Sequence, residues 1–203
     1  MSGPGDRFVL ASASPARLAT LRDAGIEPRV VVSGVDESQV TATDPAEVAA
    51  RLAELKALAV VARVDPADTS WVLGCDSVLE LGGRVLGKPD DAADAVTRWR
   101  AMRGRSGVLH TGHCLVEIGS GQQVLRAVDT VVHFADVTDD EIDAYVATGE
   151  PLHVAGAFTV DGLGGAFVRG LEGDPHNVVG LSLPALREMF VALGVRWTDL
   201  WNR

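Results

Sequence analysis

The chain alternates helix-like with strand-like segments along most of its 203 residues, and this alternation restricts the fold more than any other feature. Helix starts carry capping residues, as where Thr138 and Glu141 form the pattern of a capping box. Helices are expected at residues 15–24, 45–64, 90–102, 138–148 and 182–193. Strands are expected at residues 8–11, 28–33, 71–75, 108–118 and 124–134, with a hairpin at 77–86. This order predicts an α/β protein with a mixed, twisted sheet and flanking helices.

No repeat, low-complexity tract or linker divides the sequence. We therefore expect a single domain over residues 1–203, with two lobes that divide near residue 107. The helix expected at 45–64 is amphipathic, because apolar residues recur along it at intervals of three and four. These residues are Val48, Leu52, Leu55, Leu58 and Ala59.

Charge and composition exclude several classes of protein. The formal net charge of −10 argues against binding to nucleic-acid polymers, which requires a basic face that releases counterions. The longest apolar run, residues 57–62, is far shorter than the roughly 20 residues that span a bilayer, and the N-terminus lacks the pattern of a secretory signal. Cys75 and Cys114 are too few for a disulfide scaffold and lack the CxxC spacing of a zinc or redox site. We expect a cytoplasmic protein that associates with no membrane.

The first candidate site is the turn from the strand at 8–11 into the helix at 15–24. Ser12, Ser14 and Arg17 flank the helix start, where free backbone N–H groups and a nearby cation can bind an anion. Serines also cap many helices that bind nothing, so a plain N-cap is the alternative interpretation.

The second candidate is Asp76, which follows the apolar run 71–75. Ligands of open α/β sheets collect at strand ends, where an aspartate can hold a cation or take a proton from water. The alternative is an aspartate that only makes a turn. Lys56 and Lys88 are the only lysines among 18 basic residues, and Lys88 lies in a Gly-Lys-Pro turn. Either lysine could bind phosphate as a point charge or could be an ordinary surface residue.

Five histidines are scattered through the sequence. His110 and His113 have an HxxH spacing, but residues three apart on a strand point to opposite faces of the sheet, so a shared metal is not expected.

A series of different short motifs is spread along nearly the whole chain. The first five are Leu10-Ala11-Ser12-Ala13-Ser14-Pro15-Ala16-Arg17, Asp36-Glu37, Leu55-Lys56-Ala57, Gly74-Cys75-Asp76-Ser77 and Leu86-Gly87-Lys88-Pro89. Later ones are Thr111-Gly112, Glu141-Ile142 with Tyr145, Gly149-Glu150-Pro151, Ala155-Gly156-Ala157-Phe158 and Gly173-Asp174-Pro175. In this order and spacing they resemble the Maf family of nucleoside triphosphate pyrophosphatases, first named as septum-formation inhibitors.

The resemblance implies two lobes around a deep cleft, as in inosine-triphosphate pyrophosphatases, and a homodimer. It implies hydrolysis of a nucleoside triphosphate between the α- and β-phosphates, with Mg²⁺ or Mn²⁺, to give a monophosphate and pyrophosphate. It makes Asp76 the proton acceptor, Glu37, Lys56 and Lys88 catalytic residues, and Asp76 and Glu37 the metal ligands. The implied substrate-binding residues are Ser12, Ser14, Arg17, Ser77 and Asp161.

Three positions depart from the family pattern. Ala16 stands where the family commonly has the first of two adjacent arginines, so one cationic contact is lost. Ser77 and Asp161 match neither the branch that prefers dTTP and UTP nor the branch that acts on 7-methyl-GTP. Because a carboxylate only accepts hydrogen bonds, Asp161 favours bases with donor edges, such as guanine or cytosine derivatives.

Other functions remain open on the sequence. The protein could be a nucleotide-binding regulator of cell division whose hydrolysis is incidental. It could also be a different phosphate-ester hydrolase, which would release orthophosphate.

Overall fold

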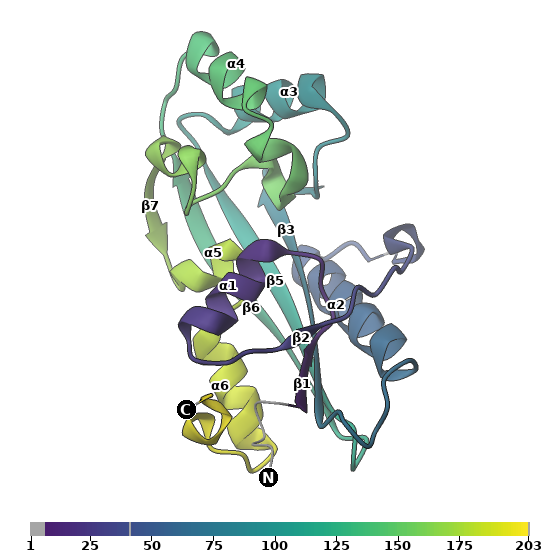
Figure 1. Ribbon diagram of the computed structural model, residues 1–203. Coiled ribbons are helices and arrows are strands. Elements are labelled where there is room, and N and C mark those ends of the chain that lie inside the picture. The colour runs from purple at the N-terminus through teal and green to yellow at the C-terminus, as the bar shows by residue number, and fades with distance from the viewer. Residues whose placement is uncertain (1–6, 41, 203) are drawn as a thin grey trace.

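The computed structural model describes residues 7–40 and 42–202, which form a seven-stranded mixed sheet with flanking helices (Figure 1). The strand order is β2-β1-β3-β5-β6-β7, and β4 pairs with β3. The strands are β1 (Phe8–Leu10), β2 (Arg29–Val30), β3 (Trp71–Leu81), β4 (Arg84–Leu86), β5 (Ser106–Glu117), β6 (Gln123–Phe134) and β7 (Val168–Glu172). The helices are α1 (Pro15–Asp23), α2 (Pro45–Val61), α3 (Ala92–Met102), α4 (Asp139–Ala147), α5 (Pro175–Val179) and α6 (Leu183–Ala192). The predicted α/β class with a mixed sheet is confirmed.

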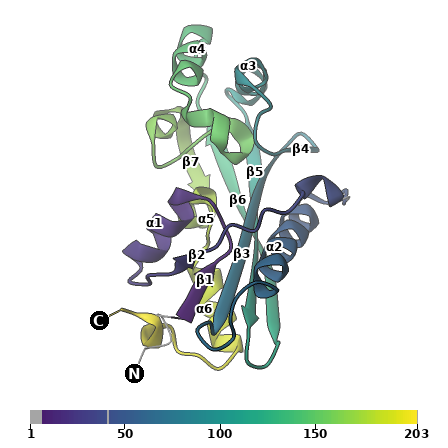
Figure 2. The ribbon, with the colours of Figure 1, turned by 45° about the vertical axis from the view of Figure 1, so that its right-hand side comes forward.

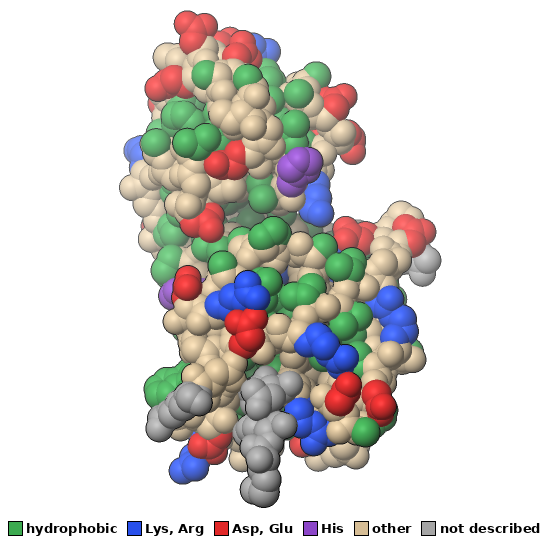
Figure 3. Space-filling view, viewed as in Figure 1, with side chains coloured by type: hydrophobic (Ala, Val, Ile, Leu, Met, Phe, Trp, Pro, Cys, Tyr) green, Lys and Arg blue, Asp and Glu red, His purple; other side chains and the backbone are tan. Residues whose placement is uncertain are grey.

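The long strands β3, β5 and β6 run through two lobes, with α3 and α4 in one and α1, α2 and α6 in the other (Figures 1 and 2). Each lobe has its own apolar core. The first is built around Trp99 and Phe134, and the second around Phe8 and Phe190 on one sheet face, with a smaller cluster under α2. The surface is hollowed between the lobes (Figure 3). Residue 107 lies within β5, and a division of the chain there stays a prediction.

Strand β3 is longer than the sequence suggested, and this moves Asp76. The apolar run 71–75 was expected to end a strand at Asp76, but β3 continues to Leu81 because β5 pairs with it from Trp71 to Glu80. Asp76 therefore lies in the middle of a strand, and the expected position at a strand end is wrong.

The middle of β3 nevertheless has one open edge. The neighbouring β1 pairs in parallel with β3 only as far as Leu73, and β4 pairs with it only from Leu79 onward. Within the described residues, no strand pairs with this edge of β3 between these two points. Asp76 and Ser77 lie in this gap, where main-chain and side-chain groups of β3 remain accessible to loops from both lobes.

Helix α2 packs unusually close to the sheet, over two glycines. A Cβ atom on Gly74 would lie 2.1 Å from the backbone oxygen of Ala53, and one on Gly112 would lie 2.1 Å from that of Ala49. The buried face of α2 is correspondingly rich in alanine: Ala49, Leu52, Ala53, Ala57 and Val60. The expected face was partly wrong, since Leu58 is 44% exposed. Small residues on both surfaces allow the approach, which a leucine-lined face would prevent.

Shorter elements complete the lower lobe. Helix α5, which the sequence pattern did not reveal, has only five residues, and Asp174 caps its N-terminus. Trp197 packs against Phe190 with ring centroids 6.3 Å apart, which places the C-terminal tail on the body of the protein. Within residues 7–40 and 42–202, every helix is too short or too polar to cross a membrane.

Candidate active site

A lysine joins two carboxylates on the face of β3 that α2 covers. The ammonium of Lys56, on α2, donates a hydrogen bond to Oδ1 of Asp76 and lies 2.7 Å from Oε1 of Glu37. Glu37 belongs to the short 3₁₀ turn Glu37–Gln39. The Lys56 and Asp76 side chains are 12% and 11% exposed, whereas that of Glu37 is 52% exposed. The structure thus brings together three residues from three different elements, at least 19 positions apart in the sequence, at the open edge of β3.

Burial shifts the pKa of the Asp76 carboxylate in the direction that suits proton transfer. Removal from water raises the pKa of Asp76, because a charged carboxylate is poorly solvated inside the protein. The positive charges of Lys56 and Arg17 oppose this rise and favour the ionised form. A carboxylate of raised pKa, held by a lysine at an accessible strand edge, is suited to accept a proton from water.

Arg17 binds β3 at the residues on either side of Asp76, Cys75 and Ser77. Its guanidinium donates four hydrogen bonds, from Nε to the Gly180 carbonyl at 2.7 Å, from Nη1 to Ser12 Oγ at 3.1 Å and to the Cys75 carbonyl at 2.9 Å, and from Nη2 to Ser77 Oγ at 3.1 Å. These contacts tie α1, the turn after β1, β3 and the end of α5 to one side chain. Arg17 is only 9% exposed, and all but one of its N–H groups are already engaged.

The predicted substrate residues Ser12, Arg17 and Ser77 therefore lie together, next to Asp76 along β3. Ser14 has a capping role, since its Oγ accepts the N–H of Arg17 at the start of α1. Direct contact of these four residues with substrate stays a prediction. In the structure itself, Arg17 fixes the Cys75 carbonyl, and so the backbone that carries Asp76.

Lys88 and Asp161 approach from the other lobe. Lys88 follows β4, is exposed, and forms no hydrogen bond or ion pair within the described residues, so its ammonium is available to a ligand. Because β4 ends opposite Leu79, the turn that carries Lys88 enters the gap in the sheet from the side opposite the Ser12 turn. The structure does not place Lys88 or Asp161 in contact with the Lys56 group.

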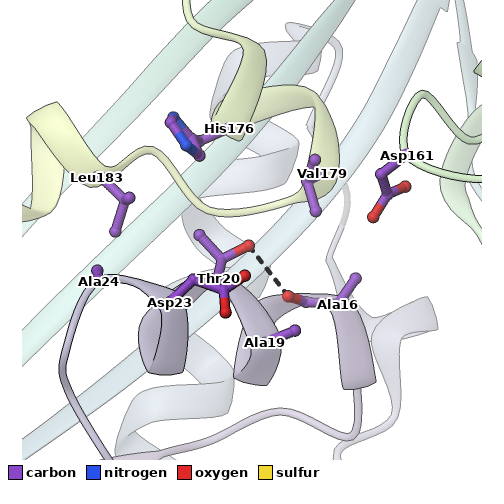
Figure 4. Close-up of a pocket in the computed structure, with 9 residues that line it drawn as sticks. All are labelled: Ala16, Ala19, Thr20, Asp23, Ala24, Asp161, His176, Val179 and Leu183. Atoms are coloured by element: carbon purple, nitrogen blue, oxygen red, sulfur yellow. Dashed lines mark hydrogen bonds between the residues drawn. The ribbon is translucent and has the colours of Figure 1, made fainter.

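Asp161 lines a pocket of about 290 Å³ between α1 and the segment that runs from α5 into α6 (Figure 4). Helix α1 forms one wall, and residues of α5 and α6 form another. Figure 4 shows Asp161 on a loop at one end of the pocket, at the end where Ala16 lies. The lining residues are Ala16, Ala19, Thr20, Asp23, Ala24, Asp161, His176, Val179 and Leu183. Ala16 lies where the resemblance implied an arginine, and no Lys or Arg is among the residues that line the pocket.

Sequence reasoning missed part of the Arg17 network. Thr111 Oγ1 lies 2.9 Å from Ser77 Oγ and donates to the Asn177 carbonyl at 3.0 Å. Asn177 is fully buried and ties α5 to β5 and β6 through three hydrogen bonds from its amide. The Thr111-Gly112 motif was a usable signal, whereas nothing in the spacing of Asn177 indicated that it would pack beneath the site.

The donor set at Asp76 suits a divalent cation. Asp76 and Glu37 both contact the Lys56 ammonium, so their carboxylates face the same position. Mg²⁺ is commonly held by one or two carboxylates and completed by substrate phosphates and water. Within the described residues, no group of three or more His, Cys, Asp or Glu side chains is arranged to hold a metal. The Asp76 and Glu37 carboxylates are thus the protein ligands that this group can offer to a cation.

Within the described residues, the side chains of the remaining titratable candidates form no hydrogen bond or ion pair with Lys56, Asp76 or Glu37. His110 contacts Asp129 and Glu80, whereas His113 is buried and accepts the N–H of Ser182, so the two histidines do not converge. Burial raises the pKa of both Cys75 and Cys114 to about 12, as expected for thiols of the core.

Comparison with known proteins places the chain in a family. The family model described as Maf-like protein matches residues 7–193, and the chain therefore belongs to the Maf-like family. It is 60% identical to a nucleoside triphosphate pyrophosphatase of Salinispora tropica, over 97% of this chain and 88% of that protein. It is 57% identical to a protein of the same name from Streptomyces coelicolor, over 98% and 96% of the two chains. A crystal structure of a dITP/XTP pyrophosphatase from Mycobacterium abscessus covers 64% of this chain, and this chain covers 73% of it, with 19% identity and a TM-score of 0.38, too low to carry an argument.

Proposed function

We propose that this protein is a nucleoside triphosphate pyrophosphatase that hydrolyses the bond between the α- and β-phosphates with the help of a divalent cation. The buried Asp76 carboxylate, held by Lys56 at the open edge of β3, is the observation that carries the proposal. The name shared by relatives at 60% and 57% identity supports the same reaction class.

Asp76 is the general base of the proposed reaction. A water molecule beside its carboxylate gives up a proton to Asp76 as the water oxygen forms a bond to the α-phosphorus. The bond from the α-phosphorus to the bridging oxygen breaks, and the electron pair leaves with pyrophosphate. Lys56 keeps Asp76 ionised before the reaction, and Asp76 returns its proton to solvent afterwards.

Charge neutralisation explains how a protein of net charge −10 binds a polyanion. Among the residues that the structure describes, Lys88 has no hydrogen-bond or ion-pair partner, so it is free to bind a phosphate from one side of the gap in the sheet. The turn at Ser12 and the N-terminus of α1 face the phosphates from the other side. When bound between Asp76 and Glu37, Mg²⁺ or Mn²⁺ would supply positive charge to the phosphate oxygens.

Product analysis tests this proposal. The purified protein, with Mg²⁺ or Mn²⁺, is incubated with canonical, methylated and deaminated nucleoside triphosphates, and the products are separated by anion exchange. We expect monophosphate and pyrophosphate, with turnover at least about a hundredfold lower in Asp76→Asn. Orthophosphate as the first product would instead indicate another phosphate-ester hydrolase.

The same experiment distinguishes the proposed enzyme from a nucleotide-binding regulator. Tight nucleotide binding without turnover of any triphosphate would contradict the proposed enzyme and favour a nucleotide-binding regulator of cell division. A role in clearing unwanted nucleotides from the cellular pool follows from the proposed reaction. The homodimer, the cytoplasmic location and the preference of Asp161 for bases with donor edges are further proposals that rest on the sequence.

A further inference from the structure

Glu150 receives an unusual number of hydrogen bonds for a side chain outside the catalytic group. It begins the 3₁₀ turn Glu150–His153, which follows α4. Its Oε1 accepts from the Tyr145 hydroxyl at 3.0 Å, from the Thr159 hydroxyl and from the Gly164 N–H at 3.0 Å. Its Oε2 accepts from the Leu163 N–H at 3.0 Å. Four donors from two segments therefore converge on one carboxylate.

These donors hold both ends of the loop that carries Asp161. Thr159 lies before Asp161, and Leu163 and Gly164 lie after it, so the loop is fastened on each side of its tip. The loop also passes directly over the carboxylate, because a Cβ atom on Gly162 would lie 2.7 Å from Glu150 Oε2. Asp161 is exposed between these fixed points and lines the pocket at the end where Ala16 lies (Figure 4).

The contacts favour the ionised carboxylate. Burial opposes ionisation of Glu150, but hydrogen bonds from Thr159, from the N–H groups of Leu163 and Gly164 and from Tyr145 outweigh it and lower the pKa of Glu150. An amide cannot replace this arrangement, because a glutamine offers one acceptor oxygen, and its NH₂ group would face donors. Substitution by glutamine therefore leaves at least one N–H of the loop unpaired while the volume of the side chain is kept.

We propose that Glu150 is a positioning residue for nucleotide selection, which fixes the loop at residues 159–164 and thereby sets where Asp161 stands in the pocket beside α1. This inference rests on the proposed function, because it assumes that a nucleoside triphosphate occupies the site. Glu150 itself contacts neither the Lys56 group nor the pocket lining. Its effect on the reaction passes through the loop.

The test compares Glu150→Gln with Glu141→Gln. Glu141 lies in the same lobe, where its carboxylate accepts hydrogen bonds from the backbone and hydroxyl of Thr138 in the capping box of α4. Its substitution removes hydrogen bonds to a glutamate without touching the Asp161 loop. Four variants are assayed for kcat and KM, each on the best and on a poor triphosphate substrate. They are Glu150→Gln, Glu141→Gln, Asp161→Asn and the double variant Glu150→Gln/Asp161→Asn.

We expect Glu150→Gln to change the ratio of kcat/KM between the two substrates by about tenfold, mainly through KM. Glu141→Gln should lower the melting temperature and leave the ratio unchanged. In the Asp161→Asn background, Glu150→Gln should have little further effect on the ratio, since residues that act through one another are not additive. Tyr145→Phe, which removes one of the four donors, should shift the ratio in the same direction by less.

An unchanged ratio in Glu150→Gln, or a full additional effect on top of Asp161→Asn, would overturn the inference. Binding of a non-hydrolysable α,β-methylene triphosphate, measured by calorimetry, keeps this result separate from the proposed function. If the wild type binds the analogue but hydrolyses nothing, the proposed function fails, and the affinity ratio between analogues of the two bases still tests Glu150. A ratio of affinities that is equal in wild type and Glu150→Gln would then count against the positioning role.

Discussion

The ammonium of Lys56 and the buried carboxylate of Asp76 are hydrogen-bonded across the interface between α2 and β3. The contact depends on how closely the helix approaches the sheet. This close approach is possible because Gly74 and Gly112 leave room for the α2 backbone. The candidate catalytic group is thus coupled to the packing of the core beneath it, and both can be disturbed by a single methyl group.

Substitution of Gly74 by alanine tests this coupling. The new Cβ atom would meet Ala53 O at 2.1 Å, which forces α2 away from β3. Overpacking of this kind costs about 3 kcal/mol of the free energy of unfolding. We expect this loss in chemical denaturation, together with a loss of turnover from the displaced Lys56. Gly119→Ala is the matched control, because a Cβ atom there meets nothing within 4 Å, and it should leave both quantities nearly unchanged.

The pH dependence of kcat/KM tests the electrostatics of Asp76. Its pKa is raised by burial, so the acid limb of the profile should lie above the range of an ordinary aspartate. Lys56 stabilises the ionised carboxylate, so Lys56→Gln should raise the pKa of Asp76 further and move the acid limb to higher pH. Arg51→Gln removes a charge from an exposed position of α2 that pairs with Glu47, and should not move the limb. A limb that stays in place or moves to lower pH in Lys56→Gln contradicts this account.

His113 predicts a loss of stability in mild acid. Burial, helped by the charge of Arg17, lowers the pKa of His113 to about 4, from 6.5 in an exposed histidine. The unfolded chain therefore takes up a proton below pH 6.5 that the folded protein does not accept until about pH 4. The stability that the neutral imidazole contributes is present above pH 6.5 and is lost as the pH falls toward 4. The loss amounts to at most about 3 kcal/mol.

Urea unfolding at several pH values checks this expectation. His113→Gln keeps an acceptor for the Ser182 N–H and cannot be protonated, so its free energy of unfolding should fall less steeply in acid than that of the wild type. His153→Gln, at an exposed position, should keep the slope of the wild type. Equal slopes for the wild type and His113→Gln would show that this histidine does not titrate as described.

Local patterns in the sequence predicted most elements of the fold. The capping box at Thr138 and Glu141 and the Ser14 cap before Pro15 lie where the sequence placed helix starts. These signals succeed because a cap and its helix are neighbours in the chain. The length of β3 and the buried face of α2 depend instead on pairing with β5 and on Gly74 and Gly112, which are distant in sequence.

The candidate site divides in the same way. Residue types and spacing indicated an anion site at Ser12 and a carboxylate at Asp76, but did not bring Lys56 to Asp76. That grouping followed from resemblance to a family and then from the structure. Nothing in the spacing of Asn177 indicated its role, and the Gly149-Glu150-Pro151 motif did not indicate that Glu150 would hold the loop at residues 159–164. Both roles arise from several long-range hydrogen bonds to one side chain.

The central claim is that water activated by Asp76 attacks the α-phosphorus. It is tested most directly by hydrolysis of a good triphosphate substrate in water enriched in heavy oxygen, with the products followed by phosphorus NMR. The account predicts that the label appears in the nucleoside monophosphate and that the pyrophosphate is unlabelled. Label in pyrophosphate, or in released orthophosphate, would contradict it.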